Sequence, residues 1–184
     1  MAEAEFRAPY PRYLDVLRYL SAFLLFTYGS AKLVGGQFHV PAAMASRPVG
    51  SLSGYWLAWF YYGYSHTYEV ILGLVEVAGA TLLLFRKTSL LGAALMLPVM
   101  TNIWMINVFY VIGVGAMCTS TFILASMLAV LWHHHHALVS VFWTDQASEP
   151  ANARRYYRIT AALVVMLVIT LMGIATWLSR RYGL

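Results

Sequence analysis

The sequence predicts an all-α protein embedded in a membrane, a bundle of five spanning helices with a cytoplasmic N-terminus. Of its 184 residues, 61% are hydrophobic and only 10% are charged. A soluble domain carries about 25% charged residues, so this chain has too little charge to cover a water-soluble surface. One cysteine and no glycine repeat exclude a disulfide scaffold and a collagen-like fibre. We expect a single membrane domain over residues 1–184, located in the bacterial cytoplasmic (inner) membrane as a multi-pass protein.

Five apolar segments are long enough to be spanning helices, because about 20 residues cross a bilayer core roughly 30 Å thick. The stretch from Ser89 to His135 is uncharged but too long for one helix, and Gly113 and Gly115 mark a turn within it. Backbone polar groups in lipid must bond within the protein, which favours helices. The expected spans are residues 14–34, 66–85, 89–110, 116–135 and 158–178.

The basic residues predict the orientation, because cytoplasmic loops carry an excess of Lys and Arg. With the N-terminus inside, three basic residues lie outside, and these are Arg47, Arg180 and Arg181. Eight lie inside, and these are Arg7, Arg12, Arg18, Arg86, Lys87, Arg154, Arg155 and Arg158. This orientation accounts for the net charge of +5. The lipid bilayer is therefore the expected partner, and we expect no nucleic-acid partner.

Residues 35–65 form the one long outer connection, and its second half is densely aromatic. Seven of the ten residues from Tyr55 to Tyr64 are Trp, Tyr or Phe. Such rings favour the headgroup level of a membrane, where one end is dry and the other wet. This outer aromatic segment is either a short helix lying on the outer leaflet or a lid folded over a pocket between the spanning helices.

Three charged residues, Lys32, Glu69 and Glu76, are counted inside the expected spans. An ionisable side chain costs about 2.5–3.5 kcal/mol there, so it is usually paired, hydrated or neutral. Glu69 and Glu76 share a helix face with Gly73, whose small size permits close helix packing. Two interpretations stay open. One is a structural network in which Lys32 pairs with Glu69 or Glu76, and the other is a cavity that holds a small ligand or exchanges protons.

Polar side chains from four segments collect in the same outer half of the bundle. Glu76 is the strongest single candidate, because a carboxyl near the midplane that is not paired with Lys32 is neutral and can donate a hydrogen bond or relay a proton. No catalytic residue is assigned. The candidate ligand-binding or proton-relay residues are Lys32, Glu76, Glu69, Tyr28, Asn102, Asn107, Gln37 and His66.

The run His133–His136 lies at the cytoplasmic end of the fourth expected span. Consecutive residues on a helix point in different directions, so only the first and last of the four share a face. We interpret the run as an interfacial polar cap and expect no metal. His66 lies at the opposite side of the membrane, so the two cannot ligate one haem.

Several short motifs lie along the first four spans, and together they resemble the pattern of DoxX-like membrane proteins. They are Tyr28-Gly29-Ser30-Ala31-Lys32-Leu33 with Gly36-Gln37-Phe38, Gly63-Tyr64-Ser65-His66-Thr67-Tyr68, Gly73-Leu74-Val75-Glu76, Leu84–Gly92, Met100–Ile103 and Asn107–Tyr110. The resemblance covers about residues 14–135. It implies a four-helix membrane core with a fifth C-terminal span appended, in which Lys32, Glu76 and Asn102 are polar core positions.

The resemblance also implies a redox association. The family's namesake is similar to the small subunit of a thiosulfate:quinone oxidoreductase, and mycobacterial relatives are linked to thiol and oxidant defence. Dithiol chemistry within one chain requires two cysteines. This sequence has only Cys118, so it departs from the family on this point.

We therefore expect a redox-associated inner-membrane protein, a candidate subunit of an oxidoreductase, that binds a quinone-like or lipidic ligand in a polar pocket. Quinone is the candidate cofactor, and a redox protein and a second copy of the chain are candidate partners. Two alternatives stay open: a proton-coupled small-solute carrier that uses Glu76, and a non-catalytic assembly or chaperone subunit of a membrane complex.

Overall fold

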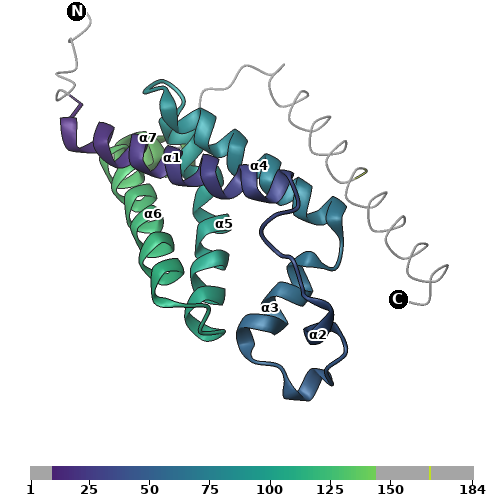
Figure 1. The fold of residues 1–184 in the computed structure, drawn as a ribbon. Coiled ribbons are helices and arrows are strands. Elements are labelled where there is room, and N and C mark those ends of the chain that lie inside the picture. The colour runs from purple at the N-terminus through teal and green to yellow at the C-terminus, as the bar shows by residue number, and fades with distance from the viewer. Residues whose placement is uncertain (1–9, 144–165, 167–184) are drawn as a thin grey trace, which may run out of the picture. The chain divides into compact units, whose positions relative to one another are not determined.

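The computed structural model describes residues 10–143 and Met166. Within this part of the chain every regular element is helical (Figure 1). By internal contacts the chain divides into two units, residues 1–138 and 139–184. The elements in chain order are α1 Arg12–Leu33, α2 Ala42–Ala45, the 3-10 turn η1 Val49–Ser51, α3 Gly54–Gly63, α4 His66–Leu84, α5 Ser89–Phe109, α6 Val114–His133 and α7 His135–Trp143.

Three of these helices, α4, α5 and α6, are long and apolar enough to cross a membrane, judged by length and composition. Their most apolar stretches have mean hydropathies of 1.6, 1.7 and 2.0. These findings support the coarser prediction of a helical bundle suited to a lipid bilayer. That α1 also crosses, and which way the chain faces, stay predictions. The predicted fifth span at 158–178 lies outside the described residues except for Met166.

The ends of the four long helices lie within two residues of the predicted boundaries. The hairpin between α5 and α6 turns at Gly113, whose φ of 145° suits a residue without a Cβ. Val111 in the same turn has a φ of 52°, an uncommon conformation for a β-branched residue. At the start of α4, the Ser65 hydroxyl accepts a hydrogen bond from the backbone N–H of Tyr68 at 3.3 Å, as an N-cap residue does.

The four long helices are arranged as two pairs, α1 along α4 and α5 along α6, and the pairs contact each other through α4 with α5 and α1 with α6 (Figure 1). Contacts at one end of the unit show that successive long helices alternate in direction. Asp15 near the start of α1 bonds Arg86 just after α4. The ring of Tyr10, just before α1, contacts that of His133 at the end of α6.

Helices α1 and α4 approach each other closely where Gly29 faces Gly73. A Cβ on Gly29 would lie 3.0 Å from the Gly73 carbonyl oxygen, and one on Gly73 would lie 2.8 Å from the Gly29 carbonyl oxygen. Small residues at such a crossing let two backbones come together. The same Gly29 Cβ would meet Glu76, whereas Leu33 lies against Gly73. Rising numbers in α1 thus match falling numbers in α4, so this pair is antiparallel.

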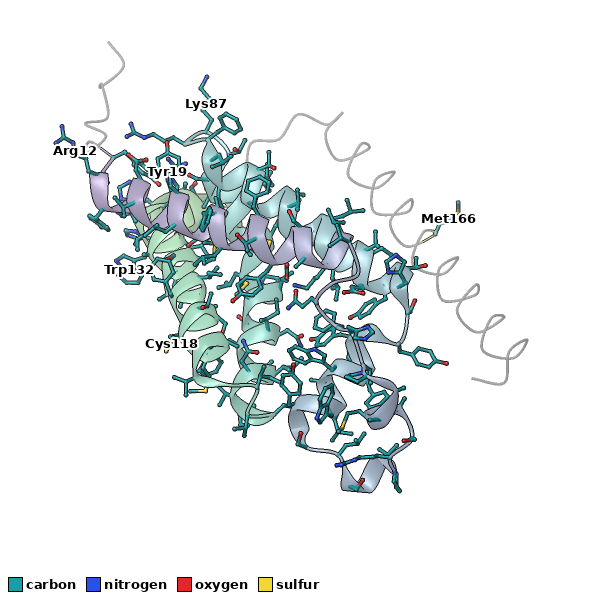
Figure 2. All side chains as sticks on the ribbon, viewed as in Figure 1. Arg12, Tyr19, Lys87, Cys118, Trp132 and Met166 are labelled. Carbon is teal, nitrogen blue, oxygen red and sulfur yellow. The ribbon has the colours of Figure 1, made fainter. Side chains whose placement is uncertain are left out.

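One half of the bundle, around the start of α1 and the end of α6, is filled by a closely packed core. Figure 2 shows Arg12, Tyr19 and Lys87 at that end of the unit, with Cys118 toward the other end of α6 from Trp132. The core residues share near-complete burial, and they are Leu14, Ala22, Leu25, Ala80, Leu83, Ala93, Met96, Met100, Ile123, Met127 and Val130.

The packed half also contains charged residues. The predicted spans therefore contain more than the three charged residues counted from the sequence. Arg18, counted above among the loop charges, lies inside α1 and is fully buried. Its guanidinium donates to the Leu83 carbonyl and to Asp15, each at 2.6 Å. Asp15 accepts a second guanidinium, that of Arg86. The sequence count missed this cluster because it assigned basic residues near a helix end to a loop.

Candidate ligand-binding site

The other half of the bundle, around the end of α1 and the start of α6, contains a partly open cavity of about 520 Å³. Its walls come from α1, α4, α5 and α6, and its roof from α3 and the residues before it. Ligand pockets in proteins typically occupy about 300–1,000 Å³ and combine an apolar lining with a few polar groups. Most of the lining here is apolar, including Leu25, Leu72, Val99, Met100, Ile103, Ile106 and Ile123.

A buried ion pair stands in the wall of this cavity. The Lys32 ammonium donates to both carboxylate oxygens of Glu76, at 2.9 Å to Oε1 and 2.7 Å to Oε2. Only 4% of Lys32 and 2% of Glu76 is exposed. The sequence left open whether Lys32 pairs with Glu69 or Glu76, and the structure shows the pair with Glu76. The ion pair of one interpretation and the cavity of the other occur together, because both paired residues line the cavity.

The direction of side chains on helices explains how these two residues meet. Lys32 is near the C-terminal end of α1, whereas Glu76 is ten residues beyond the start of α4. Side chains on a helix tilt toward its N-terminus. Because the two helices are antiparallel, Lys32 tilts into the bundle and Glu76 tilts back toward the end where α1 finishes. The close crossing at Gly29 and Gly73 brings the two backbones near enough for the tilted side chains to touch.

Two aromatic rings also contact the Lys32 ammonium. The Lys32 nitrogen lies 5.7 Å from the ring centre of Phe38 and 5.9 Å from that of Tyr28, both within the range of a cation–π contact. Phe38 in turn stacks on Tyr62, with ring centres 5.0 Å apart, and meets the edge of Trp59 at 5.4 Å. The positive charge of Lys32 is therefore balanced by a carboxylate and two ring faces.

The aromatic segment forms the roof of the cavity. Ala58, Trp59 and Tyr62 of α3 line it, and Ala58 and Tyr62 are buried. Gly63 permits this fold, because a Cβ there would lie 2.5 Å from the Phe38 carbonyl oxygen. Of the two interpretations from the sequence, this placement matches the lid.

Helix α5 contributes neutral polar groups to the cavity lining. Asn102 Oδ1 accepts a hydrogen bond from the Tyr62 hydroxyl at 3.2 Å. Burial, with a smaller effect of neighbouring phenols, raises the pKa of Tyr62 to about 12, so the phenol keeps its proton at neutral pH. The Asn107 amide donates to Ser120 at 3.0 Å and to the Ala116 carbonyl at 3.1 Å, which ties α5 to α6.

Gln37 is a polar group of the cavity that the protein leaves unpartnered. It lines the cavity just after α1, where Gly35 in a left-handed conformation turns the chain. Its buried Oε1 has no hydrogen-bond partner among the described residues. A buried acceptor without a donor costs about 1–3 kcal/mol.

Two of the predicted site residues lie outside the cavity lining. His66 begins α4 with its side chain largely exposed, and its Nδ1 lies 3.8 Å from Oε2 of the buried Glu69. Six others, Tyr28, Lys32, Gln37, Glu76, Asn102 and Asn107, all line the cavity. Tyr68, which lies between His66 and Glu69 in the sequence, lines the cavity, whereas those two do not.

The histidine run does not extend the site. His133 ends α6, His134 follows it, and His135 begins α7. The rings pack on each other and on neighbouring aromatic residues, as with Trp132 and His135 at 5.5 Å. In the part of the chain that the structure describes, no group of three or more His, Cys, Asp or Glu side chains is placed to hold a metal ion.

Sequence reasoning did not identify the lining residues of the roof as individual members of the site, and these are Phe38, Ala58, Trp59 and Tyr62. The aromatic density of the segment was visible, but which rings turn inward depends on where α3 contacts the bundle. No periodic pattern in a ten-residue helix this rich in rings distinguishes the inner face from the outer.

Comparison with known proteins yields one informative relative. Over 138 residues the chain is 35% identical to a Bacillus subtilis (strain 168) protein described as uncharacterized protein YwoB. The alignment covers 75% of this chain and 84% of that protein. No family model and no solved structure matches the chain, so the resemblance to DoxX-like proteins stays a prediction. Identity and coverage of this extent show that the chain belongs to the same family as YwoB.

Proposed function

We propose that this protein binds a quinone-like or lipidic ligand in the cavity between α1, α4, α5 and α6. The observation that carries the proposal is an apolar cavity of about 520 Å³ built around the Lys32–Glu76 ion pair. An apolar volume of this size suits a hydrocarbon body, and the convergent polar groups suit one polar end.

The ion pair itself favours a functional site over a purely structural one. Removing two charges from water is costly, and well-packed apolar residues in their place are often neutral or stabilising. A buried ion pair is therefore weak support for stability, whereas polar groups that line a cavity can orient a bound molecule. Six of the eight predicted candidate residues lie around this one volume, which is the arrangement that binding requires.

The proposal includes a place for the protein in the cell. We propose a multi-pass protein of the bacterial inner membrane with a four-helix core of the DoxX type, a fifth C-terminal span and a cytoplasmic N-terminus. The support is the excess of basic residues in the segments assigned to the cytoplasm. The redox association, with a redox protein or a second copy of the chain as partner, rests on the DoxX resemblance.

Single cysteines in a Cys118→Ser background test this orientation. A membrane-impermeant maleimide applied to spheroplasts should label Ser51→Cys, in the outer connection, and should not label Lys87→Cys. Both side chains are exposed, so accessibility within the protein is matched. The reverse labelling pattern would overturn the proposed orientation.

Ligand binding is tested on protein purified from its own membranes. Solvent extracts analysed by mass spectrometry should contain a quinone or another hydrophobic molecule in a fixed ratio to protein. Quinone analogues should raise the unfolding temperature. Clean extracts together with no thermal shift from any analogue would reject the proposal.

A further inference from the structure

We propose that the end of the bundle where α1 begins and α4 finishes binds the phosphate groups of anionic phospholipids. This basic surface is formed by Arg12, Arg86 and Lys87, and it lies in the packed half of the bundle, outside the cavity. The proposal therefore does not depend on the proposed function. It follows from an excess of positive charge at this end, from the exposure of the side chains that carry it, and from the tyrosines beside them.

The charge excess arises because four basic side chains share one carboxylate. Asp15 accepts hydrogen bonds from Arg18 at 2.6 Å and from Arg86 at 3.0 Å. It is the only acidic residue at this end within residues 10–143. Arg12 and Lys87 form no ion pair among the described residues. A single carboxylate between two guanidinium groups is already used, so the other two cations are free to bind an anion from outside the protein.

The basic side chains are accessible and lie near one another. Arg12 and Asp15 are three residues apart on α1, so they share a helix face, and Arg86 reaches Asp15 from the turn after α4. Arg12, Arg86 and Lys87 are all exposed. Figure 2 shows Arg12 and Lys87 at the same end of the unit. Positive charge placed at the end of spanning helices attracts the anionic lipids of a membrane surface.

Tyrosines beside these charges place the surface at the depth of lipid headgroups. Tyr13 and Tyr19 are 60% and 51% exposed, and the Tyr10 ring centre lies 5.2 Å from the Arg86 guanidinium carbon. Tyrosine favours the membrane–water interface, where its ring is half dry and its hydroxyl is wet. The connection between α1 and α3 carries Arg47, the only other exposed Lys or Arg within residues 10–143. The attraction for anionic lipid is therefore concentrated at one end.

Native mass spectrometry of the full chain in detergent tests the proposal with two lipids of equal acyl chains. Phosphatidylglycerol carries an uncompensated phosphate, whereas phosphatidylcholine carries a phosphate beside a quaternary ammonium. A basic residue near an anionic headgroup strengthens binding roughly fivefold. The wild type should therefore retain phosphatidylglycerol in preference, and Arg12→Gln and Lys87→Gln should each lower that affinity roughly fivefold. Arg47→Gln, the matched change of an exposed arginine elsewhere, should bind as the wild type does.

A cavity variant distinguishes this surface from the cavity. Ile103 lines the cavity, so Ile103→Trp should keep the preference for phosphatidylglycerol. Loss of the preference in Ile103→Trp would place the lipid in the cavity and overturn the proposal. Equal retention of the two lipids by the wild type, or an equal loss of affinity in Arg47→Gln, would overturn it as well. A wild type that carries no quinone or other cavity ligand counts against the proposed function alone.

Discussion

The two halves of the bundle each bury a cationic side chain of α1, but they use it differently. Arg18 lies in the packed half, fully buried, with a backbone carbonyl and Asp15 as its partners. Lys32 lies in the half that holds the cavity and is paired with Glu76 in the cavity wall. Where apolar side chains fill the surrounding space, as around Arg18, a buried charge links neighbouring helices. Where space is left, as around Lys32 and Glu76, a buried charge lines a cavity.

Breaking the Lys32–Glu76 pair from one side should produce the largest effect. Glu76→Gln leaves a buried ammonium without its carboxylate, and loss of one partner of a buried pair costs about 3–5 kcal/mol. Denaturant unfolding in detergent measures this loss.

The matched control is the double variant Lys32→Met/Glu76→Met, in which no charge remains. Its free energy of unfolding should lie close to that of the wild type, and its ligand content should fall sharply. A double variant that is as unstable as Glu76→Gln would show that the pair serves the fold.

The Arg18 cluster should give the converse result. Arg18→Ala empties a buried site and leaves the Leu83 carbonyl unpaired, which together cost about 2–4 kcal/mol. The ligand content of the folded fraction should stay unchanged, because the cavity lies in the other half of the bundle. Arg86→Gln, a change in an exposed partner of Asp15, should destabilise far less. Loss of ligand from folded Arg18→Ala would show that the packed half and the cavity are not independent of each other.

The contact between roof and wall should give the smallest effect. Tyr62→Phe removes the hydrogen bond to Asn102 and should cost about 0.5–1.5 kcal/mol. It also changes the pH dependence, because Tyr62 has a pKa of about 12 in the fold against an ordinary value of 10.0. The stabilisation from this raised pKa is complete below pH 10 and is lost as pH rises toward 12. Tyr62→Phe should therefore unfold with a shallower alkaline limb than wild type, and identical limbs would contradict the assignment.

Most of the helical framework could be predicted from sequence, because apolar length and glycine turns are local signals. The hairpin at Gly113 and the start of α4 at Ser65 are examples. The partner of Lys32 was not predictable, since it depends on the antiparallel crossing at Gly29 and Gly73 and on the tilt of two side chains. The burial of Arg18 was hidden for a related reason. A basic residue near a helix end resembles a loop charge until its partners from α4 are known.

The inner face of α3 depends on tertiary contacts in the same way. Phe38 and Trp59 are separated by a long connection, and nothing local indicates that their rings meet under the roof. Polar candidates were easier to identify than apolar ones, because a few amides and charges stand out in an apolar chain. Six of the polar candidates therefore line the cavity, whereas the aromatic roof was described only as an alternative.

The central claim, that the cavity holds a hydrophobic ligand, is tested most directly by filling it. Ile103 lines the cavity, whereas Ile71 lies on α4 with half of its surface exposed outside it. Native mass spectrometry of protein released from membranes should show bound ligand on the wild type and on Ile71→Trp, and clearly less on Ile103→Trp. Equal ligand retention by the two tryptophan variants, or bare protein in every sample, would contradict the account.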